Sequence, residues 1–196
     1  MSMETMEAFA ARVTAAFREA FPEDGRRLVF GEGCAERPPV LLIGEAPGRH
    51  EEEQGRPFVG QAGKNLDEFL RVLELERGAI RIANVVKVRP TRVSAKGTVS
   101  NRPPDRRELA FFRPYLLEET ALVCPGLIVT LGNTALQSFT DDTIGACHGR
   151  RQTVTVAGQT YGLFPLYHPA AVIYDRSLRE VYLEDLQALK KELGRD

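Results

Sequence analysis

The sequence predicts an α/β fold, a three-layer α/β/α sandwich with a central, mostly parallel sheet of four strands. Two observations carry this prediction. Short apolar runs alternate along the chain with longer segments of helical periodicity, which is the order of elements in a parallel sheet covered by helices. The runs at residues 39–43 and 127–131 lack polar alternation, as expected of strands buried on both faces. We expect one domain over residues 1–196, because this length supports a single core.

The individual elements follow from the same patterns. Strand-like runs occupy residues 28–30, 39–43, 80–86 and 127–131, and alternation over residues 151–166 predicts a hairpin that carries the last core strand. Helical spacing of apolar residues predicts helices at residues 4–20, 66–73, 105–117, from Asn133 onward, and 177–193. Pro22 ends the first helix, and Asp105 caps a later one together with Glu108. Residues 91–104 are polar and basic and contain prolines, which predicts a loop.

Composition excludes several classes of protein. The net charge of −1 excludes a histone-like chain, although a local basic groove remains compatible with it. Such a groove is expected from residues 81–113, which contain nine Arg or Lys residues and only two acidic residues. The three cysteines form no CxxC, which argues against a disulfide framework or a four-cysteine metal site. No apolar run reaches the length of a membrane span and no signal peptide is evident, so we expect a soluble, cytoplasmic protein without membrane contact.

Distinctive residues follow the predicted core strands. GEAPG at residues 44–48 ends the first, Asn84 lies on the second, Gly132 follows the third, and His168 follows the fourth. Parallel α/β sheets bind ligands beyond the carboxyl ends of their strands. We therefore expect these residues to converge on one pocket. A Rossmann-type nucleotide site is not expected, because no GxGxxG follows the first strand.

Three motifs in this order suggest a family. They read GEAPGRHEEEQGRPFVGQAG at residues 44–63, NVVKVRP at 84–90 and YHPA at 167–170. The pattern over residues 28–175 resembles the uracil-DNA glycosylase superfamily, most of all family 4. The resemblance implies a monofunctional glycosylase of base excision repair, which flips uracil out of DNA and hydrolyses its N-glycosidic bond. DNA with uracil or another deaminated base would be the partner, and the protein would act as a monomer. The alternative is a relative that binds damaged or single-stranded DNA without cleaving it.

The chain departs from family 4 at the cysteines that hold an iron–sulfur cluster in that family. Val88 stands at the cysteine position of NVVK-C-RP, and Phe112 stands at that of C-RP-[FY]-L. The CxxC expected ahead of the first core strand is missing from the helix at residues 4–20. Because cluster ligation needs thiolates, we expect no cofactor and no metal. Ordinary packing would replace the cluster.

The resemblance also assigns roles to residues that contact the base. Phe58 would be the stacking platform, and the amide of Asn84 would pair with uracil O4 and N3–H. His168 would donate from a neutral imidazole to O2 as the bond breaks. Glu45 and Glu51 are the candidates for positioning water, since Ala46 occupies the place of an aspartate in the better-known branch. The backbone at Gly44, Ala46, Pro47 and Gly48 would approach the base closely.

The remaining candidates would contact DNA outside the flipped base. Gly60 and Gly63 precede a helix and would bind the DNA backbone through their amides. The expected phosphate contacts are Lys87, Arg89, Arg150 and Arg151. Val172, after the HPA motif, would be the apolar wedge that fills the gap left by the flipped nucleotide.

Overall fold

A six-stranded sheet forms the centre of the computed structural model, which describes residues 4–174 and 177–194. Its order is β1-β3-β2-β6-β8-β7. The strands span β1 (Glu32–Gly33), β2 (Val40–Gly44), β3 (Arg81–Asn84), β6 (Leu127–Leu131), β7 (Gln152–Val156) and β8 (Gln159–Leu166). The inner four, β3, β2, β6 and β8, are mutually parallel, whereas β1 and β7 are antiparallel to their neighbours. The mostly parallel α/β sheet is confirmed.

The number of strands differs from the expected four, because an antiparallel strand is added at each edge. At one edge, the strand expected at residues 28–30 is absent, and the pairing with β3 is made by Glu32–Gly33 instead. There the chain passes so close to Ile80 that a side chain at Gly33 would collide with the Ile80 carbonyl oxygen. At the other edge, β7 and β8 form the expected hairpin. Ala157 and Gly158 both have positive φ at its turn, as a tight two-residue hairpin requires.

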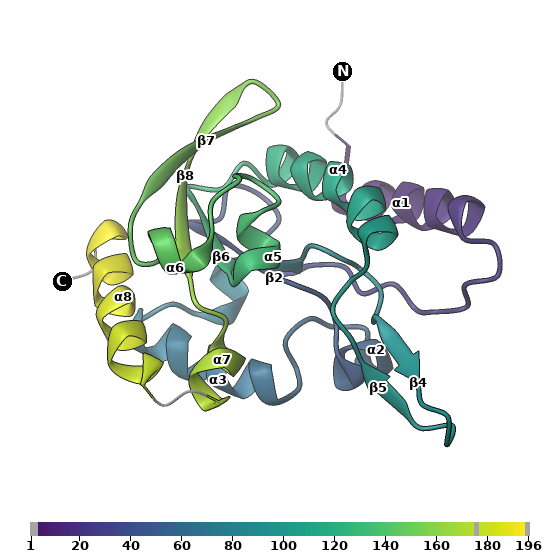
Figure 1. Ribbon diagram of the computed structural model, residues 1–196. Coiled ribbons are helices and arrows are strands. Elements are labelled where there is room, and N and C mark those ends of the chain that lie inside the picture. Colours follow the sequence, from purple (N-terminus) through teal and green to yellow (C-terminus); the bar gives the residue numbers. More distant parts are fainter. Residues whose placement is uncertain (1–3, 175–176, 195–196) are drawn as a thin grey trace.

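Helices cover both faces of the sheet (Figure 1). On one face, α1 (Met6–Ala20) and α4 (Arg106–Val123) pack on alternate strand residues such as Leu41 and Ile43. On the other face, α3 (Gln61–Val72) and α8 (Leu178–Glu192) pack on Val40 and Leu42. The alternation of β2 side chains between two cores is what an α/β/α sandwich requires. No helix within the described residues is long and apolar enough to cross a membrane.

Shorter elements surround the carboxyl ends of the parallel strands. They are α2 (Arg49–Gln54), α5 (Asn133–Leu136), α6 (Ile144–Cys147) and α7 (Pro169–Tyr174), whereas the 3₁₀ helix η1 (Arg77–Ala79) precedes β3 at its amino end. A separate two-stranded sheet, β4 (Thr91–Val93) and β5 (Val99–Asn101), lies where the sequence predicts a loop. The cap of α4 is as predicted, since Asp105 and Glu108 exchange side-chain and backbone hydrogen bonds of 2.9 Å.

Candidate active site

A cavity of about 330 Å³ lies at the carboxyl ends of β2, β3 and β8, beside the N-terminus of α3. The residues predicted from the sequence that line it are Ala46, Gly48, Glu51, Phe58, Gly60, Asn84 and His168. These residues come from three motifs, of which the first and the last are more than a hundred positions apart in the sequence. The parallel sheet brings them together. The convergence expected from the strand ends is therefore present.

The ring of Phe58 and the amide of Asn84 pack against the backbone at Gly44. Gly44 and Asn84 face each other across β2 and β3. A β-carbon at Gly44 would lie 2.4 Å from the Phe58 ring and 2.6 Å from Asn84 Oδ1. Gly44 is buried, as is Pro47. The missing side chain at Gly44 therefore makes room for the Phe58 ring and the Asn84 amide, and an approach of the Gly44 backbone to the base stays a prediction.

The loop that carries Phe58 is held in an unusual conformation. Phe58 has φ +52°, a left-handed value that is costly for a bulky residue. The Arg77 guanidinium donates to the carbonyl oxygens of Pro57 and Phe58 at 2.7 and 3.0 Å. On the other side, Glu51 Oε1 accepts the backbone N–H groups of Val59 and Gly60 at 2.9 and 2.7 Å. Two charged side chains thus hold the loop that carries Phe58 from opposite sides.

These contacts revise three predicted roles. Glu51 also accepts the N–H of Gly48 at 3.1 Å, so its carboxylate anchors the loop rather than standing free beside the substrate. The amide of Gly60 is used by Glu51 and is not available to a phosphate. Gly63 lies buried in the first turn of α3, where a β-carbon would be 2.0 Å from the Phe58 carbonyl oxygen. Gly63 is therefore a packing residue and not a DNA contact.

His168 has a defined tautomer. Its Nδ1 accepts the backbone N–H of Ala170 at 3.2 Å, so the proton of the neutral ring must be on Nε2. Burial lowers the pKa of the imidazole from 6.5, and the opposing effect of the Glu45 carboxylate is smaller. A buried imidazole that is neutral and protonated on Nε2 can donate one hydrogen bond into the cavity. The ring lies nearly parallel to that of Phe58, at 27° and 6.4 Å between centroids.

Glu45 faces a second cavity, of about 480 Å³, which shares His168 with the first. Its Oε2 accepts a hydrogen bond from Thr134 Oγ1 at 2.5 Å. Thr134 lies on α5, directly after the end of β6, and also lines this cavity. Of the two predicted carboxylates, Glu45 is therefore the one that keeps an oxygen free of hydrogen bonds from the described residues.

Lys87 is not a phosphate contact. Its side chain is wholly buried, and Nζ donates to Glu119 Oε2 and to the carbonyl oxygen of Asn84, both at 2.7 Å. Arg81 donates to the other oxygen of Glu119 at 3.1 Å. Burial alone would raise the pKa of Glu119, but Lys87 and Arg81 outweigh burial and lower it. This buried network supports the backbone of Asn84 instead of presenting charge to DNA.

The other basic candidates differ in exposure. The side chain of Arg89 is only 12% exposed, and it donates to Asn101 Oδ1 at 2.8 Å and pairs with Glu52 at 3.3 Å. Arg150 and Arg151 are exposed, and Arg151 pairs with Glu192. Val172 lies on α7, but its side chain is outside the described part of the chain. Sequence reasoning missed Arg77, Thr134 and Asn101, the last of which lines the main cavity from β5.

The residues at the cluster-ligand positions do not fit an iron–sulfur cluster. Val88 and Phe112 are fully buried in one apolar cluster with Phe9, Val13 and Phe17 of α1. The rings of Phe17 and Phe112 stack at 5.5 Å between centroids. Across the described residues, no group of three or more His, Cys, Asp or Glu is placed to hold a metal ion. Hydrocarbon packing occupies the place where the family pattern puts thiolates.

Comparison with known proteins agrees with the fold. The sequence profile described as the Uracil DNA glycosylase superfamily matches residues 30–190, so the chain belongs to this superfamily. Within it, the chain is close to family 4. It is 34% identical to the type-4 uracil-DNA glycosylase of Saccharolobus solfataricus over 86% of this chain and 77% of that protein. It is 33% identical to the one from Thermotoga maritima over 98% of this chain and 97% of that protein.

Proposed function

We propose that the protein is a monofunctional DNA glycosylase that excises uracil from DNA by hydrolysing the N-glycosidic bond. One observation carries the proposal: an aromatic platform, an amide and an Nε2-protonated imidazole line a single cavity of about 330 Å³, contributed by Phe58, Asn84 and His168. The type-4 enzymes to which the chain is similar carry uracil-DNA glycosylase in their names.

Each group has a distinct task in the proposed reaction. Phe58 stacks on the flipped base, and the Asn84 amide accepts from N3–H and donates to O4. The bond to the sugar breaks as negative charge grows on uracil, and His168 Nε2–H donates to O2 of the departing base. Glu45, held by Thr134, orients the water that attacks the sugar and stabilises the positive charge that develops there. The water delivers hydroxyl to the sugar carbon, and its proton balances the uracil anion.

The wider site extends the proposal to DNA. Arg150 and Arg151 contact phosphates, together with the partly exposed Arg89, and Val172 fills the gap left by the flipped base. Other deaminated bases are further candidate substrates, and the protein acts as a monomer in the cytoplasm. The alternative of binding without cleavage has less support, because His168, the proposed donor to the departing base, lines the same cavity as Phe58 and Asn84.

The test is excision from labelled oligonucleotides that carry uracil, hypoxanthine, xanthine or a mismatched thymine, in single and double strands. We expect abasic sites, revealed by alkaline strand cleavage, at uracil. Asn84→Ala should abolish excision, while Arg37→Gln, at the amino end of β2 and away from the cavity, should leave it unchanged. Tight binding to the lesions without abasic sites would refute the proposed hydrolysis.

A further inference from the structure

The β4–β5 hairpin shows an unusual distribution of side chains beside the cavity. Thr91 pairs with Asn101 and Val93 with Val99, so these four residues share one face, and Arg92 and Ser100 share the other. Asn101 lines the cavity next to Gly48. The face that closes the cavity therefore continues outward as a pair of valines, which are 67% and 53% exposed.

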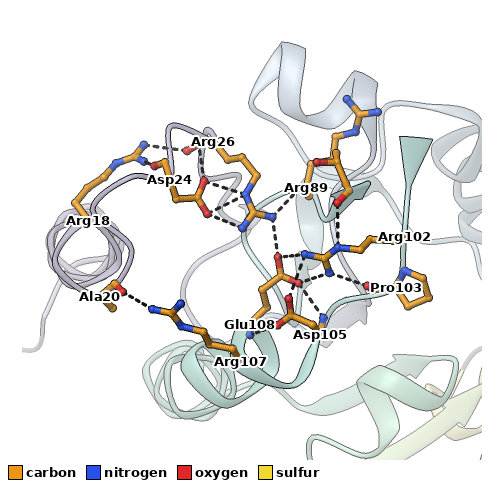
Figure 2. A network of polar contacts seen from close by, with 11 residues as sticks. Arg18, Ala20, Asp24, Arg26, Arg89, Arg102, Pro103, Asp105, Arg107 and Glu108 are labelled. Carbon is orange, nitrogen blue, oxygen red and sulfur yellow. Dashed lines mark hydrogen bonds and ion pairs between the residues drawn. The ribbon is translucent and has the colours of Figure 1, made fainter. Parts of the chain in front are cut away.

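The base of this hairpin is fixed and its tip is free. Arg102 donates to the carbonyl oxygen of Thr91 at 3.0 Å and to both oxygens of Glu108 at 2.7 and 2.9 Å. Figure 2 shows Glu108 between Arg102 and Arg26, which joins the hairpin base to the start of α4. Figure 1 shows β4 and β5 projecting beside α2, away from the sheet. An isolated two-stranded ribbon is marginally stable, so this anchoring keeps the projecting arm in place.

The charge of the hairpin suits a polyanion. Residues 91–104 contain Arg92, Lys96 and Arg102 and no acidic residue. Arg102 is neutralised by Glu108, whereas Arg92 and Lys96 form no ion pair with any described residue. Elsewhere in the basic stretch 81–113, Arg81 and Lys87 are buried on Glu119, and Arg107 and Arg113 donate to backbone carbonyls. Arg106 is exposed and also forms no ion pair with a described residue, so the unpaired charge of this stretch lies on α4 and on the arm beside the cavity.

We propose that the β4–β5 hairpin is a DNA-binding arm, which holds the strand on one side of the nucleotide that enters the cavity. The proposal rests on the proposed function. From Asn101 to the valine pair is two residues, about 7 Å along an antiparallel strand. Val93 and Val99 then contact the sugar and base of a flanking nucleotide, while Arg92 and Lys96 contact its phosphates. The arm thereby adds affinity for a strand without contacting the base that is cleaved.

Two pairs of substitutions separate the two kinds of contact. Arg92→Gln with Lys96→Gln removes the charges, and Val93→Ser with Val99→Ser removes the apolar pair. Arg37→Gln is the matched control, because it removes an exposed charge near the amino end of β2, whereas the cavity lies at the carboxyl end of that strand. Unchanged circular dichroism and melting temperature show that each variant is folded. Binding to a uracil-free single-stranded 20-mer, followed by fluorescence anisotropy, tests the arm independently of catalysis.

We expect the charge variant to bind this 20-mer about tenfold more weakly, and the slope of log K against log salt to flatten by about 1.4, or 0.7 for each of two contacts. The valine variant should lose about fivefold with an unchanged slope, since it removes apolar contact only. Parent-like binding by both variants would overturn the proposal. If the unsubstituted protein failed to excise uracil, the proposed function would be refuted, but the binding measurements on the uracil-free 20-mer would still test the arm.

A second experiment tests where the hairpin lies relative to the bound strand. Single-turnover excision is measured on 20-mers with uracil two positions from either the 5′ or the 3′ end, at increasing enzyme concentration. Because the hairpin stands on one side of the cavity, both variants should raise the half-saturating concentration for one of these substrates and not for the other. The maximal rate should stay unchanged. An equal penalty at both ends, or a lower maximal rate, would show that the hairpin shapes the cavity and would overturn the proposal.

Discussion

The hydrogen bond from the Ala170 N–H to His168 Nδ1 leaves the proton of the neutral imidazole on Nε2, from which it can be donated. The first prediction concerns this single residue. His168→Ala should lower the maximal single-turnover rate of uracil excision about a hundredfold or more, the cost of one preorganised donor. DNA affinity should change much less, because the bond strengthens only as charge grows on the leaving base. Rates and binding are measured separately. A variant that cleaves at the parent rate would remove His168 from the mechanism.

The same imidazole predicts a pH profile. Burial places the pKa of His168 below 6.5, and only the neutral ring is the proposed donor state. The maximal excision rate should therefore fall with a midpoint below pH 6.5, as the ring takes up a second proton. Single-turnover rates between pH 5 and 8 give the profile. A decline centred above 6.5 would contradict the assigned protonation state.

Lys87 shows how a residue's surroundings can reverse its predicted role. The motif around residues 84–90 suggested a phosphate contact, but the sequence does not reveal that Glu119, on a distant helix, meets the Lys87 side chain in the interior. Lys87→Met should destabilise the fold by about 3 kcal/mol, because it removes one partner of a buried ion pair. The salt dependence of DNA binding should stay as in the parent. Denaturant unfolding and salt titration measure the two effects, and a flatter salt slope would restore the phosphate role.

At the scale of elements, the loop between α2 and α3 depends on Arg77 for the left-handed conformation of Phe58. Arg77→Met should weaken capture of uracil about tenfold, because backbone strain of about 1–3 kcal/mol is then no longer held in place. Arg56→Met is the comparison: Arg56 lies in the same loop and pairs with the same Glu32, but its side chain has no hydrogen bond to the backbone of Pro57 or Phe58 among the described residues. The half-saturating enzyme concentration for uracil excision is measured for each variant and compared with the parent. Equal effects would assign the loss to Glu32 instead.

Periodicity predicted the long elements and missed the short ones. The apolar runs of β2 and β6 and the spacing in α1 and α4 locate the core because burial dictates those residues. The β4–β5 hairpin has three-residue strands with exposed side chains, so hydrophobic alternation could not reveal it. Site residues at strand ends were predictable from the motifs. Arg77, Thr134 and Asn101 were not, because their roles depend on which loops meet in space.

At the scale of the whole molecule, the apolar cluster around Val88 and Phe112 joins α1 and α4 to the sheet. We predict that the purified protein is colourless and contains no stoichiometric iron or sulfide, because these side chains offer no thiolate to a cluster. Its melting temperature should not change on treatment with a strong iron chelator. Visible spectra, iron and sulfide analysis and thermal unfolding provide the measurements. A brown protein that loses stability with the chelator would contradict the prediction.

The aromatic stack of Phe17 and Phe112 also bears on how the protein is made in a cell. We expect a core packed from such side chains to form as the chain folds, without delivery of inorganic sulfide or a scaffold protein. Peroxide or nitric oxide, which dismantle exposed clusters, would find no cluster ligand at Val88 or Phe112. We therefore expect the protein to reach the same folded state whether iron is scarce or abundant during its synthesis.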